Sequence, residues 1–206
     1  MEDIFTFFSD LSYLGVFLLL FLVNVPPILM PPTWLVLSSF YLLDDSMSPF
    51  LLALVGATGA TAGRFVLLRF SMLFQRYMNQ ERRSSLDKVA DYLRTKKLGY
   101  LLVTFLFSIS PLPSNVLFVG YGLMRAKSLQ IYLGFWVGRV IAYFVMISIS
   151  KVVLTPFTQL FEDRLLGVLV IDALAVASLV FFTSVKWDVL IKEKKLRFVK
   201  PRLWRI

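Results

Sequence analysis

The chain has 206 residues, 58% of them hydrophobic and 17% charged, with a mean hydropathy of +0.75, which is too apolar for a soluble domain and fits one polytopic membrane unit. The net charge of +9 does not imply nucleic acid as a partner, because most basic residues lie just outside the hydrophobic segments, where positive-inside topology and anionic headgroups account for them. There is no Cys and no His, which removes thiolate and imidazole metal sites, Cys and His nucleophiles and the histidine base of many hydrolases. We expect no cofactor, no metal and no catalytic residues.

The first hydrophobic segment, residues 11–43, is uncharged and is broken in its middle by prolines. One helix of this length would be about 50 Å long, two full spans need about 40 residues, and the hydrocarbon core is only about 30 Å thick. We therefore predict a hairpin that turns at residues 24–33 and returns to its side of entry. Because its flanks carry Asp10, Asp44 and Asp45, it should enter from outside. The turn prolines are Pro26, Pro27, Pro31 and Pro32.

Residues 49–74 are long enough for a full span, with Ser48 as a fitting N-cap and Pro49 at the first helical position. Together with the hairpin they form a first repeat, residues 11–74. Residues 75–97 are polar and basic, with Leu86, Val89, Ala90 and Leu93 at helical spacing. This pattern predicts an amphipathic helix on the cytoplasmic surface.

Residues 98–150 repeat the arrangement, beginning with an uncharged segment that turns at Pro111 and Pro113. Basic residues lie on both sides of this segment, Lys96 and Lys97 before it and Arg125 and Lys127 after it. Re-entry places both basic flanks in the cytoplasm, as the positive-inside tendency requires, and a full span follows at residues 128–150.

Residues 165–185 form a last apolar span, interrupted by Asp172, and the basic tail at residues 186–206 should be cytoplasmic. The predicted fold is thus an all-α integral membrane protein. It is an inverted repeat of a re-entrant hairpin plus a transmembrane helix, with an additional C-terminal transmembrane helix, and residues 1–185 form a single membrane domain.

The two full spans of the repeats share the pattern GxxxGR, placed 75 residues apart: Gly59-Ala-Thr-Ala-Gly63-Arg64 and Gly134-Phe-Trp-Val-Gly138-Arg139. An arginine deep in an apolar helix costs about 3 kcal/mol on insertion scales, so two at equivalent places indicate a functional site. The alternative is structural, with each arginine bound to a hairpin carbonyl or to Asp172. The glycines are better explained by close helix packing than by phosphate binding.

Half-helix ends that meet at the hairpin tips present unpaired N–H groups and positive dipole ends suited to an anion. Thr33, and Ser114 or Asn115, suit the N-caps of the returning arms. The alternative is that the prolines only form tight turns buried in the protein and that the hairpin tips bind no ligand. The predicted substrate-binding residues are Arg64, Arg139, Asn24, Thr33, Ser114 and Asn115.

Residues 105–118, followed by Gly120-Tyr-Gly-Leu-Met-Arg125 and Gly138-Arg139, resemble the second motif of the DedA family, also called the VTT or SNARE-associated Golgi protein superfamily, in its archaeal-type form. Asn24 to Arg64 resembles the first motif loosely, and the resemblance covers about residues 11–150. At positions where many members carry acidic residues, this chain has Asn24, Ser114 and Asn115. The resemblance implies facing re-entrant hairpins and a role in moving lipid, either phospholipid scrambling or return of a polyprenyl-phosphate carrier.

We therefore expect a lipid transporter of scramblase or flippase type in a prokaryotic plasma membrane, with phosphate-headgroup lipids as partners; a homo-oligomer is compatible with these patterns. The alternatives are a proton- or ion-coupled small-solute transporter and a membrane assembly or scaffold protein. An enzyme is the least supported class, because the spans show no paired carboxylates at catalytic spacing.

Cysteine labelling tests the topology, because the native chain has no cysteine. Single Cys substitutions at Asp10 and Asp44 should react with an impermeant reagent added outside, and those at Lys97 and Arg125 only after the cytoplasmic face is opened. Labelling of positions 97 and 125 from opposite sides would exclude the inverted repeat.

Overall fold

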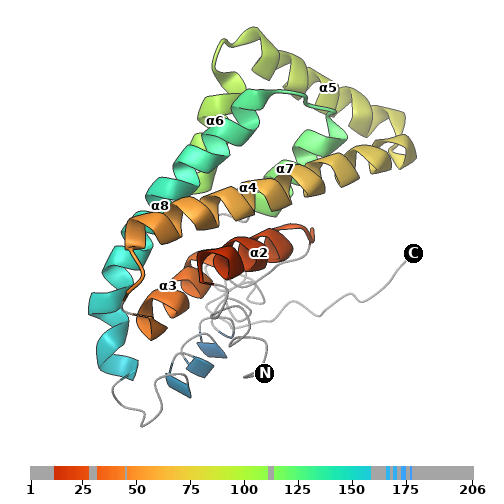
Figure 1. The fold of residues 1–206 in the computed structure, drawn as a ribbon. Helices are drawn as coiled ribbons and strands as arrows, with labels where there is room; N and C mark the ends of the chain where they lie inside the picture. Colours follow the sequence, from red (N-terminus) through yellow and green to blue (C-terminus); the bar gives the residue numbers. More distant parts are fainter. Residues whose placement is uncertain are drawn as a thin grey trace, which may run out of the picture. The chain divides into compact units, whose positions relative to one another are not determined.

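The computed structural model describes residues 12–27, 32–44, 46–110, 114–158, 166–167, 169–170, 173–174 and 177. All regular secondary structure in these residues is helical, which confirms the predicted all-α class (Figure 1). The chain divides into two compact units, Met1–Pro156 and Phe157–Ile206. Predictions for Pro31, Pro111, Pro113, Asp172 and the tail 186–206 fall outside the described residues.

Among the described residues, two helices are long and apolar enough to cross a membrane, α4 (Pro49–Phe74) and α8 (Leu129–Thr158). Helix α4 begins after Ser48 with Pro49 in its first turn, as predicted, although the Ser48 hydroxyl makes no cap hydrogen bond. Helix α8 continues beyond the predicted end at residue 150, through the charged Lys151. The Lys151 ammonium lies 5.1 Å from the centre of the Tyr41 ring, so a cation–π contact accompanies this charge within the helix.

Four shorter apolar helices form the two hairpins. Helices α2 (Tyr13–Asn24) and α3 (Thr33–Leu43) make the first, and α6 (Gly99–Ile109) and α7 (Ser114–Leu123) the second. With 10 to 12 residues each, they are about 15–18 Å long, half of a bilayer core. Pro26 and Pro27 come just after Val25, the C-cap of α2, and Pro32 precedes α3, in agreement with the helix-breaking effect of proline.

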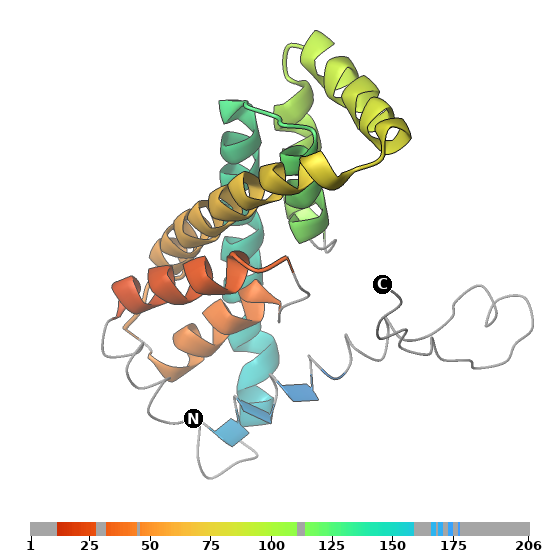
Figure 2. The same cartoon turned by 90° about the vertical axis from the view of Figure 1, so that its right-hand side faces the viewer.

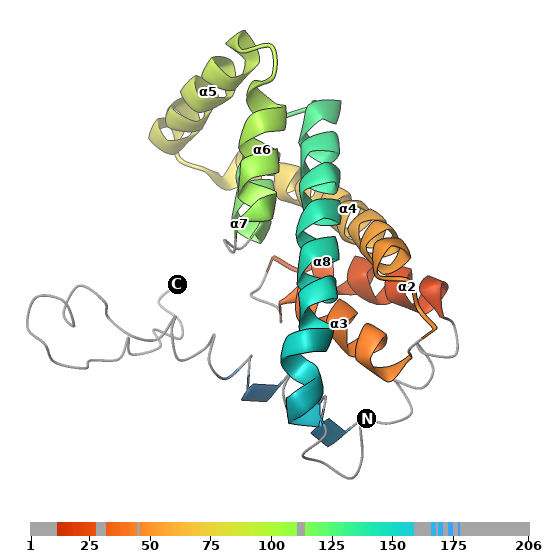
Figure 3. The same cartoon turned by 90° about the vertical axis from the view of Figure 1, so that its left-hand side faces the viewer.

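The glycines of the GxxxGR pattern pack against the first arm of the hairpin in their own repeat. Figure 2 shows α2 along α4, and Figure 3 shows α6 along α8. A Cβ atom at Gly59 or at Gly134 would stand 2.5 Å from the backbone oxygen of Phe17 or of Leu101, too close for any side chain. The contacts are Gly59 with Phe17, Gly63 with Phe21 and Asn24, Gly134 with Leu101, and Gly138 with Phe105 and Ser108.

These contacts have the same register in both repeats. The glycines of the two repeats are 75 residues apart. The hairpin residues that they contact are 84 residues apart: Phe17 corresponds to Leu101, Phe21 to Phe105 and Asn24 to Ser108. Small residues at this spacing allow two helix backbones to approach closely. The repeated sequence pattern therefore corresponds to a repeated helix–helix contact.

Further contacts join the helices across the repeats. Helix α7 packs on α4, where Gly122 lies against the Leu68 oxygen and Ser71.

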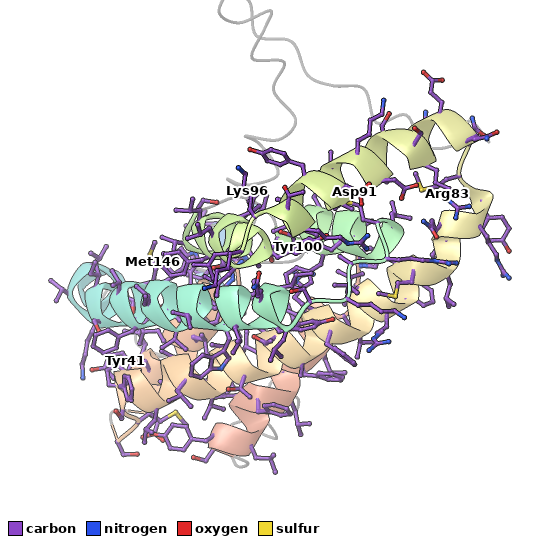
Figure 4. The ribbon with its side chains drawn as sticks, turned by 90° about the horizontal axis from the view of Figure 1, so that it is seen from above. Tyr41, Arg83, Asp91, Lys96, Tyr100 and Met146 are labelled. Carbon is purple, nitrogen blue, oxygen red and sulfur yellow. The ribbon has the colours of Figure 1, made fainter. Side chains whose placement is uncertain are left out.

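The polar helix α5 (Gln80–Thr95) follows a short 3-10 turn, η1 (Gln75–Tyr77), within the segment predicted to be amphipathic. It buries Ala90 and Leu93, while Val89, also predicted on the apolar face, is exposed. Tyr100 of α6 lies beneath α5 in Figure 4 and donates to the Ala90 oxygen at 3.4 Å.

Substitution of the packed glycines should destabilise the fold. Gly59→Ala and Gly134→Ala each push a methyl group into an opposing backbone, which should lower the free energy of unfolding by about 1–3 kcal/mol. Gly120→Ala is the matched control, because this helical glycine has no atom within 4 Å of an added Cβ, and it should be neutral or stabilising by about 0.5–1 kcal/mol. Unfolding temperatures of purified protein in detergent measure both, and equal effects at all three sites would contradict the packing.

Candidate functional site

Arg64 lies in the interior of α4 and is only 8% exposed. Its Nη1 donates to the backbone oxygen of Asn24 at 3.1 Å. Asn24 is the last residue of α2, so this oxygen is one of the carbonyl groups that a helix leaves unpaired at its C-terminal end. The Asn24 side chain itself turns back to the Leu20 oxygen, at 2.7 Å. The C-terminal end of the first hairpin arm therefore binds one nitrogen of the Arg64 guanidinium group.

Arg139, the equivalent residue in α8, is half-buried and reaches the second arm of the hairpin in its own repeat. Its Nη2 donates to the hydroxyl of Ser114, the first residue of α7, at 3.2 Å. The guanidinium carbon lies 5.2 Å from the Phe135 ring centre and 5.5 Å from that of Tyr143, so two aromatic faces stabilise the charge. Both arginines thus end at hairpin helix termini.

Two hydrogen bonds join the first hairpin to the second repeat. The Asn115 side-chain nitrogen donates to the Pro27 oxygen at 2.9 Å, which links the turn after α2 to the start of α7. The Thr33 and Tyr143 hydroxyls are 2.6 Å apart and link α3 to α8. The predicted polar site residues are therefore connected through these contacts. We call them, with Tyr143, the tip cluster: Asn24, Thr33, Arg64, Ser114, Asn115, Arg139 and Tyr143.

The tip cluster carries two positive charges, and its neighbours among the described residues are neutral. The Arg64 and Arg139 guanidinium groups are close enough for their like charges to repel each other. The Nε atoms of both arginines are buried and lack a hydrogen-bond partner among the described residues. No carboxylate of the described residues pairs with either guanidinium. Each arginine thus keeps unused donors in an interior where unpaired charge is costly.

The structure corrects one predicted capping role. Thr33 is the first residue inside α3 and its hydroxyl lies against that of Tyr143, while the Ser114 hydroxyl accepts from Arg139. The N-cap residue of α3 is Pro32, which has no side-chain donor or acceptor. The hydroxyls serve contacts between helices because residues distant in sequence lie within their reach.

Tyr143 is the site residue that sequence reasoning missed. It is fully buried, its ring lies against Arg139 and its hydroxyl against Thr33. The spacing Arg139-x-x-x-Tyr143 places both residues on one helix face, and a buried tyrosine hydroxyl needs a polar partner. These two facts, taken together, were available from the sequence.

The chemistry of the tip cluster is that of guanidinium, hydroxyl and amide groups. Among the described residues no group of three or more acidic side chains is placed to hold a metal ion. Donors therefore dominate this site, and an anion is the ligand that they suit.

A cysteine pair tests the contact between the hairpins. Pro27→Cys combined with Asn115→Cys should form a disulfide or react with a short bifunctional reagent, because the native groups are in hydrogen-bond contact. Pro27→Cys with Val116→Cys is the control, since Val116 is 65% exposed on another face of α7. Cross-linking of the control pair alone, in folded protein, would contradict the contact.

Comparison with protein-family models, with curated proteins and with solved structures found no match to this chain. The resemblance to the DedA family stays a prediction that rests on the quoted residues.

Proposed function

We propose that the chain is an integral membrane transporter, of scramblase or flippase type, that moves a phosphate-bearing lipid such as a phospholipid or a polyprenyl-phosphate carrier. The observation that supports this most is the pair of like-charged guanidinium groups at the hairpin helix ends, with unpaired Nε atoms and no described carboxylate. A phosphate group supplies the negative charge and the acceptor oxygens that these donors lack.

In the proposed mechanism the headgroup passes between the hairpin tips while the lipid tails remain in the bilayer. Arg64 and Arg139 compensate the phosphate charge at mid-depth, where hydrocarbon alone would exclude it. The neutral bonds Asn115–Pro27 and Thr33–Tyr143 must open for the headgroup to pass. Each such bond contributes about 1 kcal/mol, so opening both is accessible to thermal motion.

The membrane arrangement is part of the proposal. The hairpin helices are half a bilayer long, and the charged flanks differ in sign between the two repeats, which favours re-entry from opposite faces. The basic residues of the tail, residues 186–206, favour a cytoplasmic C-terminus. The family resemblance favours a prokaryotic plasma membrane. In place of coupled carboxylates the tip cluster has amides and hydroxyls, which favours lipid transport over a proton-coupled solute carrier.

Substitutions at the two arginines test the mechanism. Arg139→Gln removes the charge and should slow transport about 10- to 100-fold, whereas Arg139→Lys keeps the charge without the planar fork and should slow it only a few-fold. The same order is expected at Arg64. The measurement is headgroup-resolved transport of labelled phosphate lipid in reconstituted vesicles, next to the unfolding temperature of each variant.

Lys88→Gln is the control, since it removes one exposed charge from α5, away from the tip cluster. A purely structural role predicts that the Gln variants lose stability and transport together. Full transport by both Gln variants in well-folded protein would remove the arginines from the mechanism.

A further inference from the structure

Helix α4 crosses α8 obliquely in Figure 3, and side chains of the two helices are in contact at three places. The rings of Phe50 and Phe144 are 6.1 Å apart, and those of Phe65 and Tyr132 are 5.4 Å apart. Between these two pairs, the Trp136 indole donates to the Thr58 hydroxyl at 3.0 Å. We call this line of contacts the α4/α8 seam.

Arg69 lies at one end of the α4/α8 seam and takes no part in the tip cluster. It follows Phe65 by one helical turn, and its guanidinium carbon lies 5.0 Å from the centre of the Phe65 ring. The same Phe65 ring is in contact with the ring of Tyr132, from α8. Arg69 is exposed, and it has no hydrogen bond or ion pair with any described residue. Its five N–H donors are therefore free for a ligand.

The surroundings of Arg69 are those of a lipid-facing surface. Val66, Phe70 and Leu73, on the same helix, expose 38%, 52% and 60% of their surface. Arg69 is also near the C-terminal end of α4, where the polar α5 follows, so its long side chain reaches the level of the headgroups. In such a place a lone cation meets the phosphates of one leaflet.

We propose that Arg69, Phe65 and Tyr132 form a binding site for the phosphate of an anionic phospholipid, with the acyl chains along the α4/α8 seam. The Phe65 ring supports one face of the guanidinium and leaves its N–H edge free, and the Tyr132 hydroxyl supplies a second donor from the other helix. An anionic lipid fits better than a zwitterionic one, because it brings no ammonium group toward Arg69. The site rests on the membrane embedding proposed above and not on transport through the tip cluster.

Trp136 provides a local reporter, because it lies one turn from Tyr132 on the same seam. Replacing Trp34, Trp187 and Trp204 with Phe leaves Trp136 as the single tryptophan of the full chain. This protein is reconstituted with brominated phosphatidylglycerol or with brominated phosphatidylcholine of the same acyl chains, and Trp136 quenching gives the relative association of each lipid. We expect phosphatidylglycerol to be preferred about fivefold, the equivalent of about 1 kcal/mol for one basic side chain at the surface.

Arg69→Gln should abolish this preference and leave quenching by phosphatidylcholine unchanged. Tyr132→Phe should reduce the preference in part. Arg76→Gln is the matched control. Arg76 is also exposed and its guanidinium carbon lies 4.8 Å from the centre of the Tyr77 ring, but it follows the end of α4. This variant should keep the preference for phosphatidylglycerol.

Three results would overturn the site: no preference in the parent protein, an unchanged preference in Arg69→Gln, or an equal loss in Arg76→Gln, which would indicate a diffuse basic surface. Inorganic phosphate added at millimolar concentration should not displace the lipid. If it does, the site takes free phosphate and the lipid assignment is wrong. If the Arg64 and Arg139 variants transport lipid normally and Trp136 quenching still shows the preference for phosphatidylglycerol, the proposed transport mechanism is wrong and the Arg69 site stands.

Discussion

The close approach of each full span to the first arm of its hairpin is the contact on which the rest of the site depends. It needs glycine at positions 59, 63, 134 and 138, because any side chain there would meet a backbone atom or the side chain of Ser108 or Asn24. The arginine that follows the second glycine is then carried to the hairpin ends by helix geometry alone. Packing and charge placement are thus coupled in one six-residue pattern.

The two arginines are held differently although they occupy equivalent positions in their helices. Arg64 is bound by a main-chain oxygen, which no substitution can remove, whereas Arg139 is bound by a serine hydroxyl and two aromatic rings. A main-chain carbonyl is fixed by its helix, while a hydroxyl can rotate to another partner. Arg139 is therefore the guanidinium that is freer to follow a ligand.

Sequence reasoning located the helices well and the side-chain partners poorly. The uncharged runs and the prolines decide where α2, α3, α6 and α7 can form, and length and apolarity decide α4, so these elements follow from local chemistry. The apolar span of α8 was predicted close to its observed place, while the helix itself continues through Lys151, whose charge is accompanied by a Tyr41 ring that is distant in sequence.

The candidate site shows the same division. The arginines, and the polar residues beside the prolines, stand out because polar groups are rare in apolar segments. Their partners, such as Tyr143 for Thr33, depend on how the two repeats pack together. The residues around each position in the sequence do not encode that packing. The predicted N-cap at Thr33 was wrong for this reason: its hydroxyl meets that of Tyr143 in place of its own helix end.

The packing of each span on its own hairpin also bears on how the chain is made. The glycine contacts of the first repeat join residues 17–24 to residues 59–63, so every group that they need has been synthesised before the second repeat begins. Translation is slower than helix–helix association, which allows the first hairpin and span to assemble beside the ribosome. The second half then docks, through α7, on a partner that is already folded.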